Sequence, residues 1–267
     1  MTDKYAVIGN PISHSKSPLI HKIFAEQTGQ DISYEAIFAE LGDFQETVER
    51  LRKEGYKGCN VTVPFKLEAV QSCNQLEARA RDAGVVNTLR FEGSEIIGDN
   101  TDGVGLVRDI EHNLGFNLKD KQVVLMGTGG AAYGAAAALL QANAILTLGY
   151  RTEGKARLLV SKFGDVVTIV DYANIIAEKF DVIINATSSG LSNEMPPLPS
   201  GNFAPGALAY DMMYGRETPF MKFAREQGAA IVSDGLGMLV EQAAEAFFIW
   251  RGVRPDTAPV LAKLRTP

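Results

Sequence analysis

The segment Gly127-Thr-Gly-Gly-Ala-Ala132 restricts the fold of this chain more than any other stretch. It follows the strand-like run Gln122–Met126 and opens an alanine-rich helical stretch, so it matches G-x-G-x-x-A at a strand-to-helix turn. Gly127 permits the tight turn, and Gly129 lets the backbone approach a pyrophosphate at the helix N-terminus. A turn that merely requires glycine is the alternative interpretation. The position at the start of a strand–helix series favours a dinucleotide site.

Strand-like runs and helical stretches alternate along both halves of the chain. The first hundred residues contain strand-like runs at Tyr5–Ile8, Tyr34–Phe38, Gly58–Val63 and Asn87–Phe91, and helical stretches at Pro18–Gln27 and Asp43–Glu54. After the glycine-rich turn, strand-like runs follow at Ala144–Tyr150, Val166–Val170, Asp181–Asn185 and Ala207–Met212.

This alternation predicts an α/β protein with two α/β domains and a substrate-binding crevice between them. We expect residues 1–102 to form an N-terminal substrate-binding domain with a mostly parallel sheet, and residues 103–235 a C-terminal Rossmann-type dinucleotide-binding domain. Helical spacing of Leu236, Leu239, Val240, Ala243 and Phe247 predicts an amphipathic helix. The helices of residues 236–267 are expected to pack back onto the first domain.

Composition and charge favour a globular enzyme over a protein that binds nucleic acid. Of 267 residues, 46% are hydrophobic and 22% charged, as in ordinary globular enzymes, and the net charge of −6 argues against a nucleic-acid partner. The apolar run that ends at Gly9 is too short for a signal peptide, and Gly134, Gln141 and Asn143 interrupt the longest apolar stretch. Cys59 and Cys73 provide no disulfide framework. We therefore expect a cytoplasmic protein without a membrane partner.

The residues at the end of the strand after the glycine-rich turn indicate whether the cofactor is NAD or NADP. An NAD site usually places an acidic residue there for the ribose 2′-hydroxyl, whereas this chain has Tyr150-Arg151-Thr152, with Lys155 nearby. Arg151 and Lys155 could neutralise a 2′-phosphate, so the pattern favours NADP. Two solvated surface cations are the alternative.

Polar residues in the first half are arranged as if for a small anionic ligand. Ser17-Pro18 predicts a helix start with Ser17 as N-cap and Pro18 at N1, and Ser15 and Ser17 beside free amides would suit a carboxylate. In Asn60-Val-Thr-Val-Pro-Phe-Lys66, strand alternation puts Asn60 and Thr62 on one face, followed by Lys66, and Val61, Val63 and Phe65 on the other. Asn100-Thr-Asp-Gly103 then provides a carboxylate at the domain boundary, although a plain turn would also explain it.

Together these residues resemble the shikimate dehydrogenase family over nearly the whole chain. The resemblance lies in Gly9–His21, Asn60–Lys66, Gly84–Thr88, Gly98–Gly103, Gly127–Ala132, Asn185–Gly190, Thr218–Phe220 and Asp234–Gln242. It implies a reversible, NADPH-dependent reduction of 3-dehydroshikimate to shikimate, in the shikimate (chorismate) pathway of aromatic amino-acid biosynthesis. It also implies a protein that binds a small-molecule substrate and is a monomer or homodimer.

The resemblance assigns roles residue by residue. Lys66 and Asp102 would form the catalytic pair, with Lys66 as proton donor and acceptor. Ser15 and Ser17 would bind the substrate carboxylate, Tyr214 would lie near the substrate, and the residues for its hydroxyls would be Asn60, Thr62, Asn87, Asp102 and Gln242. The cofactor would contact Gly127, Thr128, Gly129, Gly130 and Ala131 at the turn, then Arg151, Thr152, Lys155, Asn185, Ala186 and Thr187, with Gly235 and Met238 against the nicotinamide. No metal is implied, because His14, His21 and His112 lack ligand spacing.

Three positions depart from the family pattern, and two rival functions fit the same fold. Tyr150 replaces the Asn of a common Asn-Arg-Thr motif, Tyr133 stands where an Arg is frequent, and Gly215-Arg216 differs from the usual residues.

An NAD-preferring quinate/shikimate dehydrogenase is disfavoured by Arg151 without an acid at the strand end. A non-catalytic binding protein of the same fold is disfavoured because both Lys66 and Asp102 are present.

Overall fold

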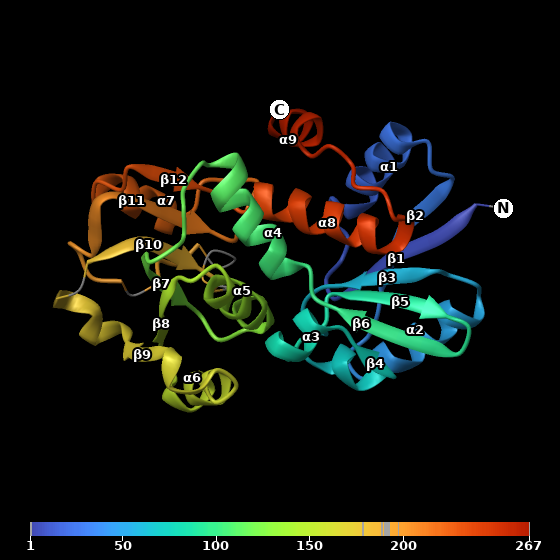
Figure 1. The fold of residues 1–267 in the computed structure, drawn as a ribbon, viewed down its shortest axis with the longest axis horizontal. Coiled ribbons are helices and arrows are strands. Elements are labelled where there is room, and N and C mark those ends of the chain that lie inside the picture. The colour runs from blue at the N-terminus through green and yellow to red at the C-terminus, as the bar shows by residue number, and fades with distance from the viewer. Residues whose placement is uncertain (1, 178, 188, 190–192, 197, 267) are drawn as a thin grey trace. The chain divides into compact units, whose positions relative to one another are not determined.

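The computed structural model describes residues 2–177, 179–187, 189, 193–196 and 198–266. The chain forms two compact α/β units, one made of Met1–Gly105 with Leu239–Pro267 and the other of Leu106–Met238 (Figure 1). Each unit contains its own sheet.

The sheet of the first unit has the strand order β2-β1-β3-β5-β6-β4. These strands are β1 (Asp3–Gly9), β2 (Ile32–Phe38), β3 (Gly58–Val61), β4 (Gln75–Leu76), β5 (Thr88–Glu92) and β6 (Glu95–Asp99). β1 is parallel to β2 and β3, and β4 is parallel to β6, whereas β5 is antiparallel to both of its neighbours. The sheet is therefore mostly parallel, as predicted. The β5–β6 hairpin, which turns at Gly93, was not expected from the sequence.

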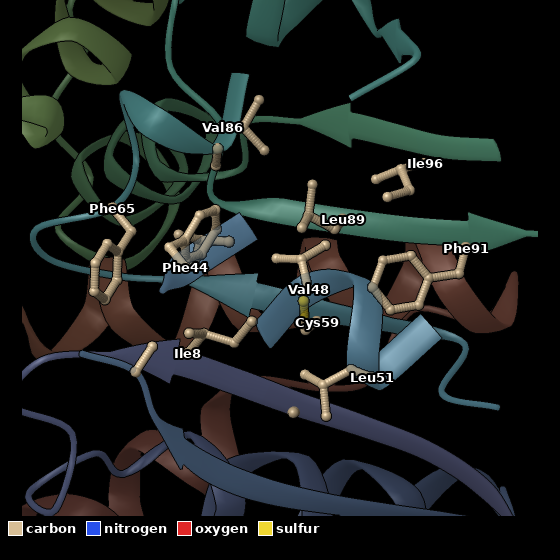
Figure 2. Packing of buried hydrophobic residues seen from close by; sticks show 14 of the residues in the cluster. Ile8, Phe44, Val48, Leu51, Cys59, Phe65, Val86, Leu89, Phe91 and Ile96 are labelled. Carbon is tan, nitrogen blue, oxygen red and sulfur yellow. The ribbon is translucent and has the colours of Figure 1, made fainter. Parts of the chain in front are cut away.

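Helices cover both faces of this sheet. On one face α2 (Phe44–Lys53) buries Phe44, Val48 and Leu51 against Ile8, Cys59 and Leu89 (Figure 2). On the other face α1 (Ser17–Thr28) and α8 (Leu236–Arg251) pack together with α9 (Ala258–Arg265), and the contacts there come from Ile20, Phe24, Val240, Ala243, Phe247 and Val260. The short helix α3 (Ala78–Ala83) precedes β5. The apolar stripe predicted for α8 is thus buried, with Leu239 only partly covered.

Several strand boundaries differ from the prediction; β11 (Phe203–Asp211), for example, begins at Phe203 and not at Ala207, and two other differences have a local cause. β3 ends at Val61, because the chain turns directly afterwards, with the Phe65 amide donating to the Thr62 carbonyl oxygen at 3.0 Å. Val63 is consequently 59% exposed and does not share the buried apolar face of Val61 and Phe65. Val166 belongs to a 3₁₀ turn, Gly164–Val166, and the following strand begins at Thr168.

The sheet of the second unit is parallel throughout, in the order β12-β11-β10-β7-β8-β9. Its strands are β7 (Gln122–Met126), β8 (Ile145–Tyr150), β9 (Thr168–Asp171), β10 (Phe180–Asn185), β11 (Phe203–Asp211) and β12 (Ile231–Ser233). This is the doubly wound order of dinucleotide-binding units, in which the topology reverses between β7 and β10. The α/β class with a Rossmann-type sheet is confirmed.

The helices of the second unit connect these strands. They are the end of α4 (Asp102–Arg108) with a π-helical turn at Asp109–Asn113, then α5 (Gly130–Gln141), α6 (Glu153–Val160) and α7 (Pro219–Glu226). Thr218 caps α7, because its hydroxyl accepts a hydrogen bond from the Met221 amide. Within the described ranges, no helix has both the length and the apolar character needed to cross a membrane.

Gly58 generates a prediction about stability. A Cβ there would overlap the Leu89 carbonyl oxygen and lie 2.6 Å from Trp250 Nε1, which donates to that oxygen at 3.0 Å. Gly58→Ala should therefore destabilise the fold by about 1–3 kcal/mol, the usual cost of overpacking, and lower the melting temperature. Gly154→Ala is the matched control, since nothing lies within 4 Å of its Cβ position in α6, and helix propensity should raise stability slightly. Equal shifts in thermal unfolding would contradict this explanation.

Candidate active site

Lys66 and Asp102 form a partly buried ion pair in the first unit. Lys66 lies in the turn after β3, and Asp102 is the first residue of α4, where an anion is favoured by the helix dipole. Lys66 Nζ is 2.6 Å from Asp102 Oδ2, and the side chains are 13% and 6% exposed. The pair predicted as catalytic is thus brought together across 36 positions of sequence.

Asn87 holds the second oxygen of this carboxylate. Its Nδ2 donates to Asp102 Oδ1 at 2.9 Å and to Thr101 Oγ1 at 3.0 Å, while its Oδ1 accepts from the Thr101 amide at 2.8 Å. Each oxygen of Asp102 therefore has a different donor, which leaves the carboxylate one orientation. The direction in which the Lys66 ammonium points follows from that orientation.

Gln242 joins the same network from α8. Its Oε1 lies 3.4 Å from Asn87 Nδ2 and 3.3 Å from Thr101 Oγ1, and its Nε2 donates to the Leu239 carbonyl oxygen at 2.9 Å. These contacts identify which end of the Gln242 amide is the oxygen and which is the nitrogen. The structure thus places Gln242 beside Asn87.

Asn60 extends the network along β3, while Thr62 is half-buried just beyond the strand. Asn60 Nδ2 donates to the Asn87 carbonyl oxygen at 3.2 Å and to Thr88 Oγ1 at 3.1 Å, and Oδ1 accepts from the Tyr34 hydroxyl at 2.7 Å. Thr101, Thr88 and Tyr34 were not anticipated from the sequence. Thr88 and Thr101 lie within the matching segments Gly84–Thr88 and Gly98–Gly103, whereas Tyr34 lies in none of them.

The predicted N-cap at Ser17 is wrong. Helix α1 begins at Ser17 itself, Lys16 occupies the cap position, and Pro18 falls at the second helical position. The Ser15 hydroxyl accepts a hydrogen bond from the amide of Ser17 itself at 3.3 Å. Ser17 is buried and Ser15 half-buried, which leaves both hydroxyls beside the start of α1.

The glycine-rich turn in the second unit lies at the topological switch between β7 and β10. Gly127 has φ +121°, and a Cβ there would lie 2.8 Å from the Ala186 carbonyl oxygen and 3.1 Å from the Thr187 amide nitrogen. Gly129 caps α5, and its Cβ position has nothing within 4 Å. Packing of the chain itself therefore requires Gly127, whereas Gly129 leaves room for a ligand. Thr128, Gly130 and Ala131 surround it.

Three candidate cofactor residues follow β8 at the surface. Arg151, Thr152 and Lys155 are exposed, and neither cation makes an ion pair with a residue that the structure describes. The nearby Arg157 differs, because it pairs with Glu153 within α6. Arg151 and Lys155 are thus available to an anion.

Asn185 shapes the backbone beside the glycine turn. It is buried, its Nδ2 donates to Asp211 Oδ2 at 3.3 Å, and its Oδ1 accepts from the Thr187 amide at 3.1 Å and hydroxyl at 2.7 Å. Asp211, which sequence reasoning missed, also accepts from the Thr218 hydroxyl at 2.5 Å, and burial raises its pKa. Ala186 and Thr187 are half-buried. Ser188 and Gly190 of the matching segment lie outside the described residues.

Gly235, Met238 and Tyr214 also belong to the second unit. A Cβ on Gly235 would overlap the Met212 carbonyl group, so only glycine fits there. The Met238 amide faces the Tyr210 hydroxyl at 3.3 Å, and Tyr210 donates to the buried Asp109 at 2.6 Å. Tyr214 is half-buried, and burial raises its pKa, so it is protonated at neutral pH.

A doubly wound parallel sheet with a glycine turn at its switch point, in a chain whose other α/β unit holds a buried Lys–Asp pair, defines the class as that of two-unit α/β dehydrogenases. Family models match as the shikimate dehydrogenase substrate binding domain (7–89), shikimate / quinate 5-dehydrogenase (109–192) and the shikimate 5′-dehydrogenase C-terminal domain (235–265). The chain belongs to the shikimate dehydrogenase family.

Individual relatives agree over the full length. The chain is 59% identical to shikimate dehydrogenase (NADP(+)) of Methylobacillus flagellatus, over 98% of this chain and 99% of the relative. A crystal structure of an Ael1 enzyme from Pseudomonas putida is 47% identical, with a TM-score of 0.92 and 100% and 99% of the two chains covered. Shikimate 5-dehydrogenase from Thermus thermophilus, solved in complex with NADP(H) and shikimate, is 30% identical, with a TM-score of 0.89 and 99% of each chain covered.

Proposed function

We propose that this chain is an NADP-dependent shikimate dehydrogenase that interconverts 3-dehydroshikimate and shikimate in the pathway to chorismate and the aromatic amino acids. The partly buried Lys66–Asp102 pair carries the proposal, because it is a proton-transfer device within a chain of this family. We further infer that the protein is cytoplasmic, is a monomer or homodimer, and has no nucleic-acid partner, in keeping with its net charge of −6.

Lys66 acts as the proton donor in ketone reduction. Negative charge develops on the carbonyl oxygen as the bond order falls, and an ammonium group within hydrogen-bonding reach can neutralise it. Asp102 orients that ammonium from 2.6 Å, and Asn87 fixes Asp102 in turn. In the oxidation of shikimate, the same lysine removes the hydroxyl proton.

Substrate recognition is assigned to the predicted substrate-binding domain, residues 1–102 with the helices of residues 236–267. Ser15 and Ser17, beside the start of α1, bind the carboxylate. The ring hydroxyls are recognised by the network of amides and hydroxyls that includes Asn60, Thr62, Asn87, Asp102 and Gln242. Tyr214 is assigned to the substrate as a protonated donor from residues 103–235.

The residues of the second unit fit a dinucleotide. The open Gly129 and the amides of Thr128, Gly130 and Ala131 suit a pyrophosphate at the start of α5, as Gly127 shapes the turn. Arg151, Thr152 and Lys155 would hold a 2′-phosphate, while Asn185, Ala186 and Thr187 form the neighbouring wall, and Gly235 and Met238 would lie against the nicotinamide. When bound, the cofactor supplies the hydride.

The two rival functions predict different residues at the end of β8 and at the Lys66–Asp102 pair. An NAD-preferring enzyme that also takes quinate would be expected to have an acid at the end of β8, where this chain has the exposed Arg151. A non-catalytic binding protein has no need for the Lys66–Asp102 pair. Steady-state assays with shikimate and quinate, each with NADP⁺ and NAD⁺, distinguish all three.

Lys66→Ala should lower kcat for shikimate oxidation by about 10²–10⁴-fold, the usual contribution of a positioned acid or base, with a much smaller change in KM. Asp102→Asn should also lower kcat, and the double variant should be far from additive because the pair acts as a unit. The exposed Lys57→Ala serves as control. A higher KM at unchanged kcat would make Lys66 a binding residue.

Arg151→Ala should raise KM for NADP⁺ by about 10–100-fold, since a hydrogen bond to a charged group contributes about 1.5–3 kcal/mol. KM for NAD⁺, which lacks the phosphate, should stay nearly constant, and the NADP preference should weaken at high salt. Arg157→Ala, which removes an exposed arginine already paired with Glu153, is the matched control. Equal losses with both cofactors would show that Arg151 supports the adenine or the loop instead.

A further inference from the structure

Tyr34, in the middle of β2, contacts the candidate substrate-binding network from a strand that holds no assigned residue. Its hydroxyl is 2.7 Å from Asn60 Oδ1, and the two side chains reach each other from β2 and β3 across the central strand β1. Tyr5 of β1 pairs with Tyr34, and Val7 of β1 pairs with Asn60. The bond therefore links two strands that do not pair with each other.

The direction of this hydrogen bond follows from the neighbours of Asn60. Asn60 Nδ2 lies 3.2 Å from the backbone carbonyl oxygen of Asn87, which can only accept. The amide oxygen must therefore face Tyr34, and the Tyr34 hydroxyl must donate to it. The Asn60 amide is therefore held in one of its two orientations, with Oδ1 on the side of Tyr34.

Ser17 also interacts with Tyr34. Burial raises the pKa of Tyr34 well above its usual value, and hydrogen bonding with the Ser17 side chain acts in the opposite direction. Tyr34 thus remains protonated at any physiological pH. It therefore interacts both with a residue assigned to the substrate carboxylate and with one assigned to a ring hydroxyl.

His21 provides a flat support for the Tyr34 ring. The rings stack with centroids 4.1 Å apart and an interplanar angle of 6°, and Trp250 and Phe247 lie around the imidazole at 5.5 and 6.1 Å. His21 is fully buried, which lowers its pKa to about 3, while hydrogen bonding with Asn60 acts in the opposite direction. It is therefore a neutral aromatic surface rather than an acid or base.

We propose that Tyr34, supported by His21, is a positioning residue for substrate recognition: it fixes the orientation of the Asn60 amide, which binds a ring hydroxyl of the substrate. This inference rests on the proposed function, in which Asn60 binds such a hydroxyl. Because the Tyr34 hydroxyl bonds to Asn60, whereas Lys66 and Asp102 bond to each other, Tyr34 should act on substrate binding and leave proton transfer unchanged.

Tyr34→Phe tests this directly, because phenylalanine retains the stacked ring and removes the hydroxyl alone. KM for shikimate should rise about 3–10-fold, the equivalent of one hydrogen bond, while kcat and KM for NADP⁺ change by less than about 2-fold. Tyr56→Phe is the matched control: Tyr56 is also buried in the first unit, and its hydroxyl contacts Glu35, away from the network. Thermal unfolding of both variants reports any loss of stability.

A double-mutant cycle separates positioning from an independent contribution. If Tyr34 acts through Asn60, adding Tyr34→Phe to Asn60→Ala should raise KM for shikimate no further than Asn60→Ala does. Multiplicative effects, or equal KM values for Tyr34→Phe and Tyr56→Phe, would overturn the inference. A wild-type protein that fails to oxidise shikimate with either cofactor would instead overturn the proposed function.

Discussion

The first unit is organised around the cost of keeping a lysine and an aspartate largely out of water. A charge removed from water is tolerated only when it is paired and its remaining lone pairs are satisfied. Lys66 and Asp102 meet at 2.6 Å, and Asn87 occupies the second carboxylate oxygen. The residues of this ion pair and of the network around it come from four elements: the turn after β3, the start of β5, the start of α4 and the middle of α8. Loss of Lys66 or Asp102 would leave the other largely buried charge without its ion-pair partner.

In the second unit, buried polar side chains also satisfy one another, and there they hold the backbone beside the glycine-rich turn. Asp211 and Asn185 are buried and satisfy each other, so the ends of β10 and β11 and the start of α7 are joined by hydrogen bonds. Their arrangement brings the Ala186–Thr187 backbone against Gly127, where a side chain would not fit. The two glycines therefore have different roles: Gly127 allows this close backbone approach, and Gly129 leaves open space beside the turn.

Much of this architecture could be predicted because it is encoded locally. Period-two and helical spacing predicted most strands and helices, and the glycine-rich turn predicted a doubly wound sheet, which is confirmed. The errors lie at the ends of helices and strands, where the local backbone departs from the pattern. Ser17 is not a cap, because α1 already begins at Ser17 with Lys16 in the cap position, and Val63 is exposed because the chain turns after Val61. The roles of individual site residues remain predictions.

The sequence by itself determined the α/β class, the glycine turn and the residue types available for proton transfer and phosphate binding, since each depends on neighbours a few positions apart. Tertiary structure alone decided which of these residues meet. Tyr34 and Asn60 lie 26 positions apart, and Asn87 and Gln242 lie 155 apart. Such contacts depend on strand order and register, which local periodicity does not specify. For that reason the pairing of Tyr34 with Asn60, and of Asp211 with Asn185, emerged only from the folded chain.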